Sequence, residues 1–118
     1  MKRKHHELEV WQTAIELVEE IYAITSGFPK HERFGLVSQL RRCSVSVPSN
    51  IAEGSARLTA REFLHFLGMA RGSLSEMETQ LIIASRLGYL DTMPTERIER
   101  VFALLGGLIN HQRKRIDL

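Results

Sequence analysis

Cysteine, proline and continuous apolar runs are all scarce in this chain of 118 residues. Cys43 is the single cysteine, which excludes an internal disulfide framework and fits a reducing cytoplasm. No segment reaches the roughly 20 apolar residues that a membrane-spanning helix requires. The basic start of the chain is followed by no apolar run, so it does not fit a secretory signal peptide. We therefore expect a cytoplasmic protein that has no membrane partner.

The composition is that of one globular domain. Hydrophobic residues make up 43% of the chain and charged residues 25%, which is ordinary for a folded domain. A chain of this length has room for one core, so residues 1–118 are expected to form a single domain. The formal net charge of +2 is mildly basic and is compatible with an anionic partner.

Apolar residues recur at helical spacing in four segments, and no strand pattern competes with them. The first helix should end near Ser26 and Gly27, because Pro29 prevents its continuation. It carries two interleaved apolar seams, each with spacings of three and four residues. One seam contains Leu8, Trp11, Ile15, Val18 and Tyr22, and the other contains Val10, Ala14, Leu17, Ile21 and Ile24.

The second helix is expected from about Glu32 to Gly54 or Arg57, with Pro48 in its interior. Proline has no N–H for the carbonyl four residues earlier and its ring crowds that carbonyl, so we predict a kink in this helix. Thr59 followed by Glu62 is a capping-box pattern that opens a third helix, which closes at Gly88. The fourth helix should start around residues 93–94.

The expected connections, at residues 27–31, 56–59 and 89–93, are short. Short connections force consecutive helices to lie antiparallel, which predicts an all-α, up-down-up-down four-helix bundle. The second seam of the first helix exceeds what one bundle core needs, as do Leu64, Ile82 and Ile83 on the third helix. We expect self-association to bury this excess, as a homo-oligomer.

Patterns typical of catalysis or metal binding are incomplete. Glu62 and His65 form one Glu-x-x-His pair, whereas di-iron bundles use two. The glycines at 68 and 72 and at 106 and 107 fall inside helices, where we expect them to allow close helix packing and not to hold a phosphate. Neither Cys43 nor the serines have a histidine base at a helical neighbour position. We expect no enzyme activity, no cofactor and no metal site.

Polar residues flank the apolar seam of the third helix at Ser73, Glu76 and Gln80. We expect a structural network in which Glu76 and Gln80 bind Arg41 or Arg42 and the carbonyl freed by Pro48, because half-buried polar groups need partners. The alternative is a ligand site. The sequence does not decide which of the two arginines points outward.

The up-down topology brings both termini and the turn between the second and third helices to one end of the bundle. This end collects eight basic residues against five acidic ones, a net charge of +3 that exceeds the +2 of the whole chain. We call the eight the basic end, and expect it to contact phosphates of RNA or DNA. The alternative is that these basic residues only face solvent and bind no partner. The basic end consists of Lys2, Arg3, Lys4, Arg57, Arg61, Arg113, Lys114 and Arg115.

Several segments together resemble the four-helix bundle proteins of the 23S rRNA intervening-sequence family. They are Phe34-Gly35-Leu36, Gln39-Leu40-Arg41-Arg42, Val45-Ser46-Val47-Pro48-Ser49-Asn50-Ile51-Ala52-Glu53-Gly54, Glu62-Phe63-Leu64, Gly72-Ser73 and Glu78-Thr79-Gln80-Leu81. The resemblance implies a small bacterial cytoplasmic protein that forms a homopentameric barrel of bundles and has no known enzymatic activity. The chain is more distantly similar to the accessory variability proteins of diversity-generating retroelements, which form the same assembly and bind a reverse transcriptase and nucleic acid.

Two functions follow as expectations. The first is a non-enzymatic oligomeric scaffold that binds nucleic acid or a ribonucleoprotein through the basic end. The second is a purely protein-binding scaffold that makes no contact with nucleic acid.

Overall fold

The computed structural model describes residues 2–117 and, for Asp117, the backbone alone. The described part contains four α-helices and no strand, which confirms the all-α prediction. Two short 3-10 turns precede α1 and α2. The helices are α1 (Glu9–Thr25), α2 (Leu36–Ser55), α3 (Ala60–Arg86) and α4 (Thr95–Asp117), and the turns are η1 (Lys4–Glu7) and η2 (Lys30–Glu32).

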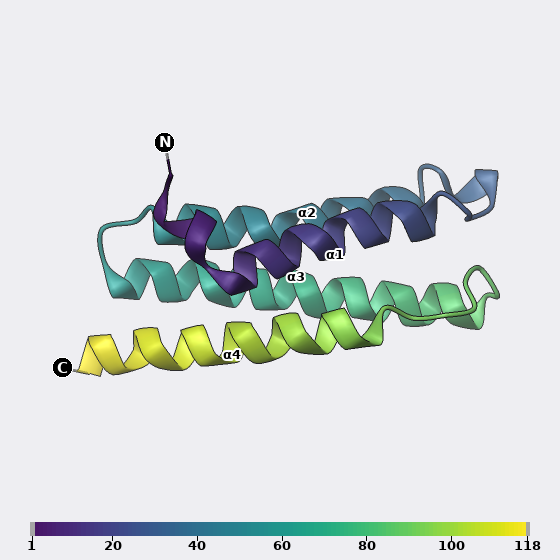
Figure 1. Ribbon diagram of the computed structural model, residues 1–118. Coiled ribbons are helices and arrows are strands. Elements are labelled where there is room, and N and C mark those ends of the chain that lie inside the picture. The colour runs from purple at the N-terminus through teal and green to yellow at the C-terminus, as the bar shows by residue number, and fades with distance from the viewer. Residues whose placement is uncertain (1, 118) are drawn as a thin grey trace.

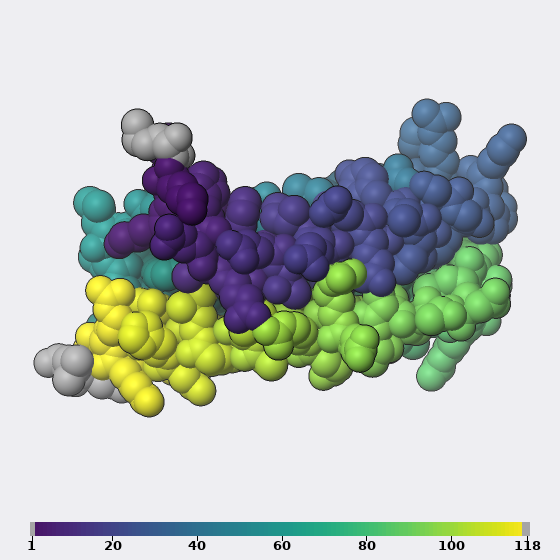
Figure 2. All heavy atoms as spheres, viewed as in Figure 1, coloured from purple at the N-terminus to yellow at the C-terminus, as the bar shows by residue number. Residues whose placement is uncertain are grey.

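Consecutive helices run antiparallel, so that the chain passes up, down, up and down along the bundle axis (Figure 1). Around the bundle, α1 packs against α2 and α4, and α3 packs against the same two helices. The N-terminal segment, the turn between α2 and α3 and the end of α4 all lie at one end of the bundle (Figure 1). The body is elongated, with principal extents of 50 × 29 × 21 Å (Figure 2).

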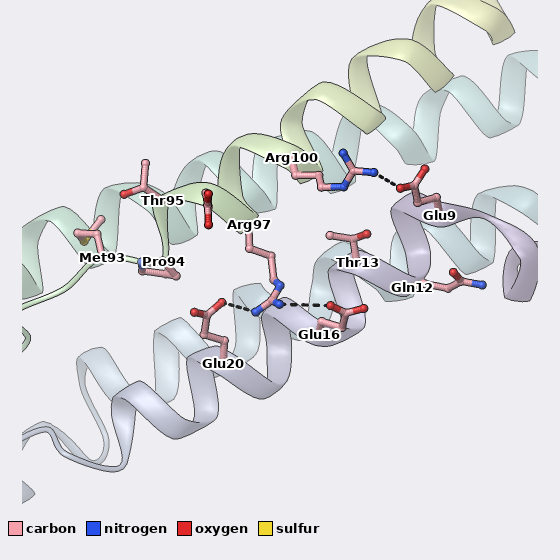
Figure 3. Close-up of a pocket in the computed structure, with 11 residues that line it drawn as sticks. Glu9, Gln12, Thr13, Glu16, Glu20, Met93, Pro94, Thr95, Arg97 and Arg100 are labelled. Carbon is pink, nitrogen blue, oxygen red and sulfur yellow. Dashed lines mark hydrogen bonds and ion pairs between the residues drawn. The ribbon is translucent and has the colours of Figure 1, made fainter.

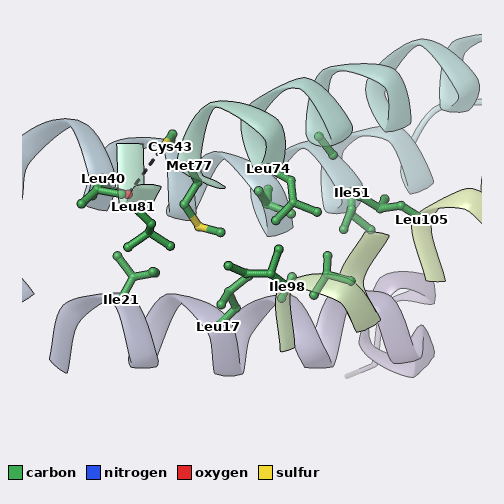
Figure 4. Packing of buried hydrophobic residues seen from close by; sticks show 14 of the residues in the cluster. Leu17, Ile21, Leu40, Cys43, Ile51, Leu74, Met77, Leu81, Ile98 and Leu105 are labelled. Atoms are coloured by element: carbon green, nitrogen blue, oxygen red, sulfur yellow. Dashed lines mark hydrogen bonds between the residues drawn. The ribbon is translucent and has the colours of Figure 1, made fainter. Parts of the chain in front are cut away.

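The core is a single apolar cluster to which all four helices contribute (Figure 4). On α1, one of the two predicted seams is buried, with Leu17 and Ile21 at its centre. The other seam lies on the flank of the helix, where Tyr22 is 41% exposed. On α3, Ile82 and Ile83 are exposed, as the excess of apolar residues predicted. The bundle therefore buries one seam per helix and leaves the surplus on its surface.

The ends of the helices show how local chemistry sets the boundaries. Thr59 Oγ1 accepts the N–H of Glu62 at 3.1 Å, so the predicted N-terminal cap of α3 is confirmed. The prediction that the second helix begins at Glu32 is wrong, because α2 begins at Leu36. The carboxylate of Glu32 accepts the N–H of Leu36 at 3.2 Å and satisfies one of the donors that a helix start leaves unpaired.

Pro48 is buried inside α2, which is helical from Leu36 to Ser55 without interruption. Ser44, four residues earlier, is also buried, as its inward position predicted. The deflection of the helix axis at Pro48 stays a prediction. Nearby, Asn50 Nδ2 donates to Ser46 O at 2.8 Å, which gives this stretch of α2 an additional side-chain hydrogen bond.

Glycines in the helices divide into two kinds. A Cβ atom at Gly54 would lie 2.7 Å from Phe66 Cβ, so α2 and α3 approach too closely there for any larger residue. By contrast, a Cβ atom at Gly68 or Gly72 would meet nothing within 4 Å, and Gly106 and Gly107 are equally open. The prediction that these four glycines allow close packing is wrong within the described chain, because their helix faces have no neighbour there.

Candidate nucleic-acid interface

The N-terminal segment, the turn between α2 and α3 and the end of α4 lie at one end of the bundle (Figure 1), and the eight residues of the basic end belong to these segments. All eight side chains are exposed. The N-terminal segment and the end of α4 form the surface at this end of the space-filling view (Figure 2). Asp117, one of the five acidic residues counted against them, has its side chain outside the described part. The topology therefore places these charges together, as the sequence predicted.

Some charges at this end have partners within the chain and others do not. Arg57 pairs with Glu53 at 3.0 Å, and its guanidinium lies 4.7 Å from the ring centroid of Phe66. Lys2 lies 3.9 Å from a carboxylate oxygen of Glu7, and Arg115 donates to the buried Gln112 at 3.1 Å. Among the residues that the structure describes, four bases make no hydrogen bond or ion pair: Lys4, Arg61, Arg113 and Lys114. Their charge is available to an anionic partner.

Sequence reasoning missed an aromatic cluster beside the basic end. The ring centroids of His5 and His6 lie 5.1 and 5.3 Å from that of Trp11. His6 Nδ1 accepts the N–H of Arg3 at 3.0 Å within the turn, and Gln12 Nε2 of α1 donates to His6 O at 2.7 Å, which joins the turn to α1. Burial, His6 and Arg3 lower the pKa of His5 from its ordinary value. A periodicity search assigns Trp11 to a seam and gives no signal for the 3-10 turn that brings the histidines to it.

The predicted polar network forms with different partners. Arg41, on α2, binds the end of α1, where its Nε donates to Thr25 Oγ1 at 2.9 Å and its Nη2 donates to Tyr22 O at 3.3 Å. Its guanidinium also lies 4.5 Å from the ring centroid of Tyr22. The expectation that Arg41 binds Glu76 or Gln80 is wrong, because the unpaired carbonyls and negative dipole at the end of α1 attract the cation.

Gln80, nine-tenths buried on α3, is held by α2. Its Nε2 donates to Gln39 Oε1 at 3.3 Å, and its Oε1 accepts from Cys43 Sγ at 3.4 Å. One α2 turn further on, the hydroxyls of Ser46 and Ser73 are 2.9 Å apart. Neither Arg42 nor Glu76 has a hydrogen bond or ion pair within the described residues, and both line a small polar cavity of about 250 Å³.

A larger hollow separates α1 from α4 (Figure 3), with a volume of about 730 Å³. Arg97 bridges the gap from α4 and reaches Glu16 at 3.3 Å and Glu20 at 2.8 Å, and Arg100 pairs with Glu9. These pairs hold the open seam between the two helices. With every arginine of this hollow already bound to a carboxylate, it offers no free cation to an anionic ligand.

The single thiol of the chain, that of Cys43, is buried. Burial, with Glu76 nearby, raises the pKa of the Cys43 thiol to about 11, so it stays protonated at neutral pH and is a poor nucleophile. Among residues 2–117, no group of three or more His, Cys, Asp or Glu side chains is placed to hold a metal ion. Within the same residues, none of the helices combines the length and apolar character that crossing a bilayer demands.

Comparison with known proteins identifies the family. No curated protein matches the sequence. The model of one family, however, matches residues 6–111, which include α1, α2 and α3 in full and most of α4. This match extends over the short segments that carry the resemblance and over the bundle that they build. The chain belongs to the family of the 23S rRNA-intervening sequence protein.

Proposed function

We propose that this protein is a non-enzymatic scaffold that binds RNA or DNA, alone or within a ribonucleoprotein, through the basic end. The observation that carries the proposal is a set of four exposed bases that have no partner among the described residues and come from three distant parts of the sequence. A structural role would pair such charges with carboxylates, as it does for Arg97 between α1 and α4. Charges that are left without partners suit phosphate oxygens.

The chemistry of this end predicts contact with the backbone of a nucleic acid and weak reading of its sequence. Trp11 is half-buried and covered by two histidine rings, and the ring of Phe66 is covered by Arg57. Few aromatic faces are therefore open for base stacking. The name of the family refers to an intervening sequence of 23S rRNA, so RNA is the first partner to test.

Self-association is part of the proposal and would repeat the basic end around an assembly. The apolar residues Tyr22, Ile82 and Ile83 are between 41% and 45% exposed, and contact between copies would bury this apolar surface. The open glycines on α3 and α4 would let another helix approach closely. The resemblance given above implies a homopentamer, in a reducing cytoplasm that suits the single buried thiol. A bend of α2 at Pro48 would shape the bundle for such packing.

The test measures binding of single-stranded and duplex RNA and DNA at increasing salt. We expect the logarithm of the affinity to fall with that of the salt concentration, by about 0.7 to 0.9 for each phosphate contacted. Replacing Arg113, Lys114 and Arg115 by alanine should lower the affinity and flatten this slope. A matched control removes three exposed bases at the opposite end of the bundle, Lys30, Arg33 and Arg86, and should bind nearly as wild type does.

Sedimentation of the same proteins separates binding from assembly. Wild type and both triple variants should sediment at a mass several-fold above the 13.5 kDa of the chain. A monomeric wild type would contradict the self-association. Equal loss of binding in the two triple variants would show that net charge alone matters, and no binding at low salt would end the nucleic-acid proposal.

The second candidate function is a scaffold for protein partners alone. Exposed apolar residues at the chain turns favour it, with Leu58 97% and Phe34 87% exposed. A capture experiment from native extract, with and without nuclease, distinguishes the two functions. Partners that survive nuclease digestion, together with no direct binding to RNA or DNA, would support the protein-binding function.

A further inference from the structure

We propose that the cavity between α2 and α3 binds a free amino acid, or a small zwitterion of the same kind, with its carboxylate at Arg42 and its ammonium group at Glu76. The two side chains come from different helices and have opposite charges. Both line the cavity, and neither has a partner within the described residues. They are farther apart than an ion pair allows, so a molecule with both charges could bridge them.

The directions of the hydrogen bonds in the wall also point to a ligand. Asn50 Nδ2 donates both to Ser46 O and, at 2.9 Å, to Ser46 Oγ. A backbone carbonyl only accepts, so this contact fixes Nδ2 as the donor. Ser46 Oγ therefore accepts from Asn50, and it lies 2.9 Å from Ser73 Oγ, where either hydroxyl can be the donor. A hydrogen bond between two hydroxyls uses one of their two hydrogens. The other has no acceptor among the described residues, and because both serines line the cavity it suits a ligand carboxylate beside Arg42.

The floor of the cavity supplies a further donor. The buried amide of Gln80 gives one N–H to Gln39 and accepts from Cys43. Its second N–H has no hydrogen-bond partner among the residues described. Because the pKa of Cys43 is raised to about 11, the floor is uncharged at neutral pH. The cavity thus has an uncharged polar floor between the positive charge of Arg42 and the negative charge of Glu76. A short polar amino acid, which carries both charges, fits this arrangement better than an ion of one sign does.

The size of the cavity sets the class of ligand. Sites for drug-sized ligands have volumes of about 300 to 1,000 Å³. The cavity here has about 250 Å³, so it suits a metabolite of a few heavy atoms. A protein interface needs about 1,000 Å² of buried surface, which a hollow of this size does not provide by itself.

Calorimetric titration with serine, threonine, asparagine and glutamine tests the proposal, using leucine as the apolar comparison. Each polar amino acid is also titrated as its carboxamide and its N-acetyl form, which remove one charge each. We expect at least one free polar amino acid to bind, and both modified forms to bind about 10- to 100-fold more weakly, as expected when one charged hydrogen bond is lost.

Two variants assign each charge to its partner. Arg42→Ala should weaken binding of the free amino acid by the same factor and leave the carboxamide form nearly unaffected. Glu76→Gln should do the same for the ammonium group and the N-acetyl form. Both side chains are exposed, so the variants should stay folded. Arg71→Ala and Glu99→Gln, two exposed residues outside the cavity lining, are the matched controls and should bind as wild type does.

Three results would overturn the proposal. The first is that no amino acid binds at millimolar concentration. The second is that the Arg42 and Glu76 variants weaken the binding of the free, carboxamide and N-acetyl forms equally. Arg42 would then not bind the carboxylate specifically, nor Glu76 the ammonium group. The third is that these variants change the sedimentation of the protein while no amino acid binds, which would assign both side chains to a contact between copies. None of these results bears on RNA binding at the basic end.

Discussion

The two helix pairs α2–α3 and α1–α4 are both seams of one bundle, yet they are built in opposite ways. Along α2–α3 small residues lie at parts of the contact, at the Ser46–Ser73 pair and at Gly54, which touches Phe63 and Phe66, so the helices meet closely there. Along α1–α4 the contact residues are long and charged, and the helices stand apart across a hollow (Figure 3). Side-chain size at the seam, more than apolar periodicity, sets how close two helices come.

This difference has consequences for the chemistry of each seam. In the close seam the buried polar groups of Gln80 and Cys43 form hydrogen bonds across the two helices. The open seam keeps its charges in contact with water, where an ion pair contributes little to stability. We therefore expect changes in the close seam to alter stability strongly and changes in the open seam to alter it weakly.

The largest effect is expected for Gly54→Ala. The added Cβ would lie 2.7 Å from Phe66 Cβ and 2.9 Å from Phe63 Cδ1, so one of the two helices must shift. Overpacking of this kind lowers the free energy of unfolding by about 1 to 3 kcal/mol, which urea unfolding can measure. Gly72→Ala is the matched control, because it meets nothing within 4 Å and should raise that free energy by about 0.5 to 1 kcal/mol. If both substitutions stabilise the protein, α2 and α3 do not approach each other closely at Gly54.

A smaller effect is expected for Arg97→Ala in the open seam. The change removes the ion pairs to Glu16 and Glu20, and the arginine side chain is 37% exposed. Pairs of this exposure contribute about 0.2 to 1 kcal/mol, and salt screens them. Urea unfolding of wild type and variant should therefore differ slightly at low salt and converge in molar salt. A loss as large as that of Gly54→Ala would show that the charges hold the seam as firmly as packing does.

The smallest effect is expected at the end opposite the basic end, where the loop between α1 and α2 contacts the loop between α3 and α4. The N–H of Leu36 and the hydroxyl of Tyr89 donate to the carboxylate of Glu32 and lower its pKa. The stabilisation is thus present above the ordinary glutamate value of 4.5 and is lost as the pH falls through the lower pKa of the folded protein.

In Glu32→Gln, we expect urea unfolding to show a slightly lower stability at neutral pH and a shallower decline in acid. Tyr89→Phe removes one of the two donors and should give an intermediate result. An acid decline that is identical in wild type and both variants would show that this contact between the loops does not contribute to folding.

Local patterns in the sequence were enough for most of the fold. Periodic apolar residues predicted four helices, Thr59 predicted a cap, and short connections predicted antiparallel neighbours, because each of these follows from residues that are close along the chain. The start of α2 was predicted four residues too early. There a side chain of the preceding turn, Glu32, caps the helix, and a periodicity search does not detect such a contact.

One candidate site could be predicted from the sequence, and the side-chain contacts of the other could not. The basic end could be predicted because topology alone brings the termini together, and topology follows from helix order and loop length. The partners of Arg41 could not be predicted, since a long side chain on a helix can reach several neighbours and only the packed structure selects the end of α1.

By itself, the sequence determined the number and order of the helices and the collection of basic charge at one end. The tertiary structure decided which seam closes tightly, which glycines carry a contact, and that Arg42 and Glu76 face one cavity without meeting. The physical reason is the range of the forces involved. Helix formation and capping act within a few residues of the chain, whereas the distance between two helices depends on the side chains that meet across the seam.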